Sequence, residues 1–166
     1  MSFPSEIILK RGLGHILFGA DPDHVRRELG EPSSVVYSPE VNKFTGAWDY
    51  AEPSCTLYFN DGPFWNPSLV GSEKPSLVMI TGASPGFTLF GDKIINEPEQ
   101  TILSRLAVHG LVNPAECPIE KYECETPANK HLYYEDALFS LYLLDGVVTH
   151  VCWQMPHEGP APSMVP

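Results

Sequence analysis

The chain has 166 residues, 43% of them hydrophobic and 19% charged, a composition that excludes a disordered or fibrous protein and indicates a soluble globular one. Its 21 acidic residues outnumber its 10 basic ones, and the net charge of −11 argues against a nucleic-acid partner, because phosphates would be repelled. Two interpretations of this charge stay open: an acidic surface that keeps the protein soluble, and one that attracts a basic partner.

The first segments predict a cytoplasmic protein with an early helix. The apolar run Ile7–Leu9 is too short for the hydrophobic region of a signal peptide, and no stretch approaches the ~20 apolar residues that span a membrane. A helix is expected after Asp21, which can cap its start, with Pro22 at the first helical position and Gly30 as its terminator.

Strands are predicted after this helix, because β-branched and aromatic residues alternate between turn formers. The expected strands cover residues 44–50, 55–60 and 77–81, with a short extra strand at 34–37. A long loop through residues 62–75 carries Phe64 and Trp65 among Pro, Gly and Ser. Such rings either fold back over the core or are offered to a partner, and both interpretations stay open.

A second helix and a second set of strands are predicted in the other half of the chain. Asn96 is the expected cap, with Glu99 as its capping-box partner and Gly110 at the end of the helix. Strands are expected at 132–134, 137–144 and 147–154, with a short extra one at 121–125. The pair Asp145–Gly146 predicts a tight hairpin turn. An edge strand such as 147–154 could pair two copies of the chain, so both a monomer and a weak dimer remain open.

Two weakly similar stretches suggest an internal duplication. A Leu-Phe-Gly triplet occurs at 17–19 and again at 89–91, and each is followed by a predicted helix and then by strands. The predicted fold class is therefore α+β: a tandem duplication of a short helix followed by a three- to four-stranded antiparallel meander, with the helices on one face of the sheet. Residues 1–154 would form one domain of two repeats, about 12–84 and 85–154, and residues 155–166, with four prolines, a disordered tail.

Cysteine and histidine provide the alternative of an enzyme. The side chains concerned are Cys117, Cys124, His131, His150 and Cys152. They could serve a small thiol-dependent hydrolase or bind a metal, but no local signature of a catalytic cysteine surrounds Cys124 or Cys152. Cys117 and Cys124 have six residues between them, whereas zinc sites usually begin with two ligands two to four residues apart. We therefore expect reduced cysteines, no metal and no cofactor.

The sequence resembles two-repeat bacterial proteins of the β-lactamase inhibitory protein type. It also resembles bacterial proteins, some regarded as immunity proteins, that carry a Phe-Gly pair and a Leu-Gly-x-Pro stretch, here Phe18–Gly19 and residues 29–32. The likeness covers about residues 15–154. It implies a binding role without catalysis, and it implies that exposed loop residues contact the partner. Those residues are Asp61, Phe64, Trp65 and Glu73, since aromatic anchors ringed by charge are typical of interfaces.

The leading hypothesis is therefore a non-catalytic cytoplasmic protein-binding module, such as an immunity protein or an inhibitor that neutralises a basic toxin. The first alternative is the Cys/His-dependent hydrolase or metal-binding enzyme. The second is a structural module, or one that binds a small ligand in the concave face of the sheet. Neither a nucleic acid nor a membrane is an expected partner.

Overall fold

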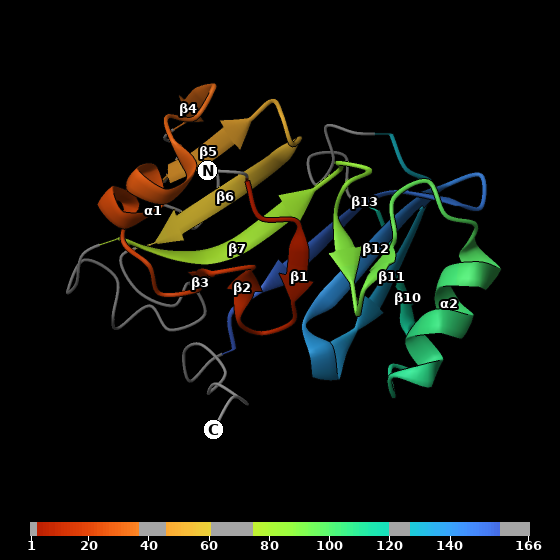
Figure 1. Cartoon of the computed structure of the whole chain (residues 1–166). Coiled ribbons are helices and arrows are strands. Elements are labelled where there is room, and N and C mark those ends of the chain that lie inside the picture. Colours follow the sequence, from red (N-terminus) through yellow and green to blue (C-terminus); the bar gives the residue numbers. More distant parts are fainter. Residues whose placement is uncertain (1–2, 37–45, 61–74, 120–126, 157–166) are drawn as a thin grey trace.

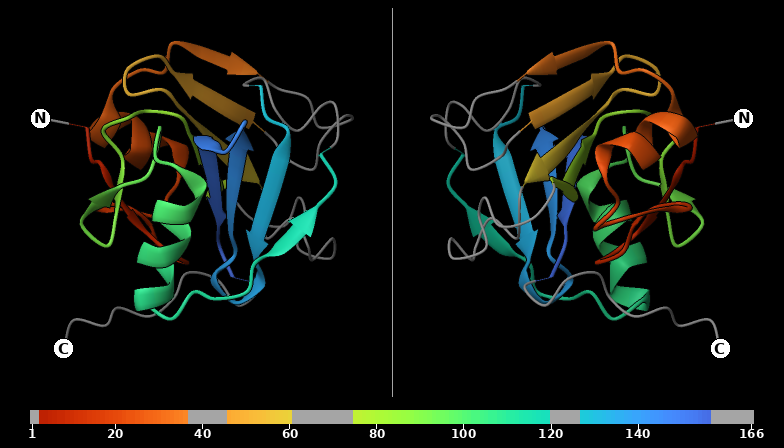
Figure 2. Two further views of the ribbon diagram at one scale, coloured as in Figure 1. Left: turned by 90° about the vertical axis from the view of Figure 1, so that its right-hand side faces the viewer. Right: turned by 90° about the vertical axis from the view of Figure 1, so that its left-hand side faces the viewer.

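The computed structural model describes residues 3–36, 46–60, 75–119 and 127–156. Within these ranges the protein is mostly β, with two α-helices and two sheets (Figure 1). The views in Figure 2 show the large sheet on one side and the helices and small sheet on the other. None of the helices in the described ranges has the length and apolar character needed to cross a membrane.

In the part of the chain that the structure describes, the large sheet has eight strands, all paired antiparallel. In spatial order these are β10 (Ala115–Cys117), β11 (Lys130–Tyr134), β12 (Phe139–Leu144), β13 (Val147–Gln154), β7 (Ser76–Gly82), β6 (Cys55–Asn60), β5 (Gly46–Tyr50) and β4 (Ser34–Val36). The seam between β7 and β13, where Gly82 pairs with Val151, joins the strands of the two chain halves into one sheet.

The small sheet has five strands among the described residues, each of two or three residues. In spatial order they are β3 (Ile16–Leu17), β2 (Gly12–Leu13), β1 (Glu6–Ile8), β8 (Thr88–Leu89) and β9 (Asp92–Lys93). The two chain halves meet here too, because β1 and β8 run parallel, with Ile7 opposite Leu89.

The two α-helices are α1 (Pro22–Leu29) and α2 (Glu99–Val108), and a short 3-10 helix covers Glu135–Ala137. The predicted start of α1 is confirmed: the Asp21 carboxylate accepts a hydrogen bond from the His24 backbone N–H at 2.8 Å. The predicted cap of α2 is wrong. Its N-cap is Pro98, without a side-chain hydrogen bond, and Asn96 instead takes a left-handed backbone (φ 69°) and donates its N–H to the Val148 carbonyl.

The core lies between the large sheet and the layer of helices and small sheet. Trp153 on β13 is fully buried, and its indole N–H donates to the Gly12 carbonyl on β2 at 2.8 Å. Phe87 packs edge-to-face on the same indole, with ring centroids 6.2 Å apart. Burial of such large rings is the main stabilising contribution to a core, so Trp153 ties the two sheets together.

The predicted fold class is wrong. Instead of a tandem duplication of a short helix and a three- to four-stranded meander, the described residues form a mostly β structure with an eight-stranded sheet and a separate five-stranded one. The sequence does not predict the small sheet, because strands of two or three residues are too short to show an alternating hydrophobic pattern.

Two further expectations concern the ends of the sheet and of the chain. The strand 147–154 is not at an edge, because β13 lies between β12 and β7, and among the described strands β4 and β10 are the outermost of the large sheet. Met155, placed in the predicted tail, is buried, and its N–H donates to the Val78 carbonyl. Residues 157–166 and the predicted strand 121–125 lie outside the described residues.

Candidate functional site

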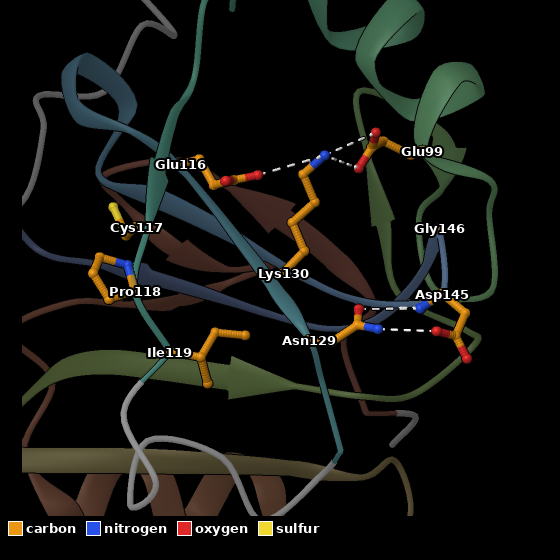
Figure 3. Close-up of a pocket in the computed structure, with 9 residues that line it drawn as sticks. All are labelled: Glu99, Glu116, Cys117, Pro118, Ile119, Asn129, Lys130, Asp145 and Gly146. Carbon is orange, nitrogen blue, oxygen red and sulfur yellow. Dashed lines mark hydrogen bonds and ion pairs between the residues drawn. The ribbon is translucent and has the colours of Figure 1, made fainter.

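An open groove with a volume of about 610 Å³ lies between the start of α2, the edge strand β10, the start of β11 and the β12–β13 turn (Figure 3). The groove is lined by Glu99, Glu116, Cys117, Pro118, Ile119, Asn129, Lys130, Asp145 and Gly146. Four separate segments contribute to it, so its composition depends on the tertiary fold rather than on one motif.

Lys130 is at the centre of the groove and is paired on two sides. Its Nζ lies 3.0 Å and 3.2 Å from the two carboxylate oxygens of Glu99, and 3.6 Å from Glu116 on β10. The hydrogen bond that Lys130 donates to the Glu99 carboxylate, with help from the charge of Glu116, raises the pKa of Lys130. The ammonium is therefore charged and already neutralised by its neighbours.

The turn beside Lys130 forms the opposite wall. Asp145 (φ 51°) and Gly146 (φ 83°) both have left-handed backbones, which confirms the predicted tight hairpin turn. Asn129 holds this turn through two hydrogen bonds: its amide donates to the Asp145 carboxylate at 2.9 Å, and its side-chain oxygen accepts from the Asp145 N–H at 3.2 Å. The Asp145 carboxylate is thereby fixed at the groove.

The charges of the groove do not cancel. Among the described residues that line the groove, three carboxylates, from Glu99, Glu116 and Asp145, face one ammonium, that of Lys130, which leaves two negative charges. Pro118 and Ile119 add an apolar wall. A groove with these properties suits the side chain of a lysine or arginine, which combines an aliphatic stem with a cationic end.

The side chains of the predicted Cys/His alternative are only partly brought together. Cys117, His131 and His150 lie in one row on the face of the large sheet that points away from the helices, and Cys152 lies on the same face in the next row. Cys124 is outside the described residues. Within the described ranges no three His, Cys, Asp or Glu side chains are placed to hold one metal ion.

Two described side chains, the hydroxyl of Ser140 and the thiol of Cys55, are poorly placed for nucleophilic catalysis. Ser140 is within 2.9 Å of His131 Nε2, but it is buried in the middle of β12, between paired residues of β11 and β13. Its neighbouring backbone amides belong to the sheet, whereas an oxyanion needs donors that are free to meet it. Burial, followed by the charge of Asp49, raises the pKa of the Cys55 thiol to about 12, which makes it unreactive at neutral pH.

The predicted partner-binding residues Asp61, Phe64, Trp65 and Glu73 lie outside the described residues, and their role stays a prediction. The groove itself was missed. By residue type and position Glu99 predicts a helix cap and Asp145 a turn, and nothing in the sequence connects Glu99 with Lys130, its partner 31 residues along the chain. A prediction of the sheet edge beside α2 would have been needed to find the site.

Comparisons with known proteins give one result for the fold. No protein-family model and no curated protein sequence matches this chain. The structure is similar to the crystal structure of an extracellular protein containing a SCP domain from Bacillus anthracis str. Ames, with a TM-score of 0.50 and 15% sequence identity. The match covers 84% of this chain but 44% of that chain, so this chain spans less than half of its length. At this identity the similarity concerns the fold alone.

Proposed function

We propose that this protein is a non-catalytic binding module for a basic partner protein, and that the groove beside α2 is a contact site. The observation that carries the proposal is the excess of two negative charges among the described residues that line an open groove, whose lysine is already paired with Glu99 and Glu116. An immunity protein, or an inhibitor of a basic toxin, belongs to this class.

The charge of the whole chain supports the same partner. A net charge of −11 attracts basic proteins over distances comparable to the Debye length and raises their association rate. The groove then supplies a local site, in which a partner cation meets Glu116 and Asp145 while its aliphatic stem lies along Ile119 and Pro118. Electrostatic complementarity of this kind contributes to specificity and to the on-rate more than to affinity.

The test uses a hexalysine peptide as the probe and hexaglutamate as its charge-reversed control. We expect the backbone amides of Asn129 and Gly146 to shift in ¹H–¹⁵N spectra on addition of hexalysine, with an affinity that falls as salt increases. Hexaglutamate should leave these amides unchanged.

Matched variants separate the groove from the general acidity. Glu116→Gln should weaken hexalysine binding by about threefold, and Lys130→Gln should strengthen it by a similar factor, because exposed charges contribute up to about 1 kcal/mol. Asp136→Asn removes one exposed carboxylate outside the groove and serves as the control. Equal effects of Glu116→Gln and Asp136→Asn would reject the groove as the site, and absence of salt-dependent binding would reject the function.

A further inference from the structure

His150 on β13 belongs to a stack of three rings on the sheet face that points away from the helices. Its imidazole stacks on Tyr142 at 4.3 Å with an interplanar angle of 5°, and Tyr142 stacks in turn on His131 at 4.4 Å and 13°. The residue is 7% exposed. Its orientation is therefore fixed by its neighbours, and a polar atom on it is costly unless something pairs with it.

A β-bulge determines which nitrogen of His150 carries the proton. His150 pairs with Tyr142 and Val148 with Leu143, so Thr149 is an extra residue. The Thr149 hydroxyl donates to the Tyr142 carbonyl at 3.1 Å. Because a hydroxyl has one hydrogen, its 3.0 Å contact with His150 Nδ1 requires that Nδ1–H donates to the Thr149 oxygen. In the neutral ring Nε2 then has a lone pair and no hydrogen.

This lone pair has no hydrogen-bond partner within the part of the chain that the structure describes. Burial, and to a smaller extent the nearby His131, lowers the pKa of His150 to about 4, so Nε2 stays unprotonated at neutral pH. A buried acceptor without a partner is rare in folded proteins and calls for an explanation. A bound ligand that pairs with this lone pair would be such an explanation.

Cys152 lies two residues further along β13 and on the same face, opposite Ser140. It is half-buried and forms no disulfide. An imidazole nitrogen and a thiolate are the ligands preferred by Zn²⁺ and related thiophilic ions. The hydrogen bond from Nδ1–H to Thr149 is also the kind of contact that fixes the ring of a metal-binding histidine.

We propose that His150 Nε2 and Cys152 Sγ form a binding site for a thiophilic metal ion such as Zn²⁺. Binding replaces the S–H bond of Cys152 with an S–metal bond and releases one proton to solvent. The described residues do not gather a third ligand around these two. We expect weaker binding than at a closed structural zinc site.

The experiment titrates the reduced, chelator-treated protein with Cd²⁺, which reports on thiolate binding through an ultraviolet charge-transfer band. The full chain should bind one equivalent. His150→Gln and Cys152→Ser should each weaken binding by at least about tenfold, since loss of even an outer partner of a ligand costs that much. His109→Gln and Cys117→Ser are the matched controls and should bind normally. Undiminished binding in folded His150→Gln, or no band in the unaltered protein, would overturn the proposal.

A second measurement uses only the unaltered protein, so it tests the site even if the variants fail to fold. The unaltered protein is alkylated with iodoacetamide with and without Cd²⁺, and each cysteine is quantified by mass spectrometry. Cd²⁺ should protect Cys152 and leave the labelling of Cys117 unchanged. Equal labelling of Cys152 in both conditions would count against the site.

Discussion

Gly82, at the seam between the two chain halves, lies directly against a buried ring. A Cβ at this position would lie 2.4 Å and 2.7 Å from two ring carbons of Phe87. Contacts between carbon atoms are favourable at about 3.5–4.0 Å, so the ring would have to move by about 1 Å. It has little room, because Phe87 is 1% exposed and packs edge-to-face on the fully buried Trp153. Gly82→Ala should therefore cost about 2–3 kcal/mol, in the upper range for overpacking.

Urea denaturation followed by tryptophan fluorescence measures this cost, and thermal unfolding should shift by about 5–10 °C for a chain of this size. Gly86→Ala is the matched control, since its nearest neighbour is the Ser84 hydroxyl at 3.6 Å, and it should change the free energy of unfolding by less than about 0.5 kcal/mol. Adding Phe87→Leu to Gly82→Ala should give a coupling of about 1 kcal/mol in the stabilising direction. A Gly82→Ala variant as stable as the Gly86→Ala control would refute the argument.

The remaining predictions concern hydrogen bonding and ionisation. Trp153→Phe should lower stability by about 1–3 kcal/mol in urea denaturation, because it leaves the buried Gly12 carbonyl without its donor; a change below about 0.5 kcal/mol would mean that the bond contributes little. The pKa of His150 is about 4 in the folded protein and 6.5 in the unfolded chain. With a chelator present to remove metal ions, His150 therefore takes up a proton only in the unfolded chain as the pH falls from 6.5 to 4. The free energy of unfolding should fall by about 2 kcal/mol between pH 6.5 and 4, after allowance for the partial solvent contact of the ring, and the His150→Gln variant should not show this decrease. Cys55 should resist iodoacetamide at pH 8 in the folded protein and react in urea, as read by mass spectrometry, and rapid labelling of folded protein would contradict its raised pKa.

The sequence predicted the parts of this fold that depend on local chemistry. The helix after Asp21 and the Asp145–Gly146 turn follow from a side-chain cap and from two positive φ angles, and both are found. Asn96 has the residue type of a cap but is held by the Val148 carbonyl, a contact across the fold that outweighs the local preference. The small sheet and the groove depend entirely on such distant contacts, as the bonds from Trp153 to Gly12 and from Lys130 to Glu99 show. For this reason the strands were predicted better than the site.

The edges of the large sheet bear on how the protein behaves at high concentration. β10 is three residues long, and Pro114 and Pro118 stand on either side of it. Proline has no backbone N–H. A strand from another molecule could therefore pair with β10 over only a few residues before it meets a proline that donates no hydrogen bond. Short, proline-bounded edges of this kind oppose aggregation through sheet extension. At β10, therefore, the groove can stay exposed without the neighbouring edge strand recruiting a second copy of the chain.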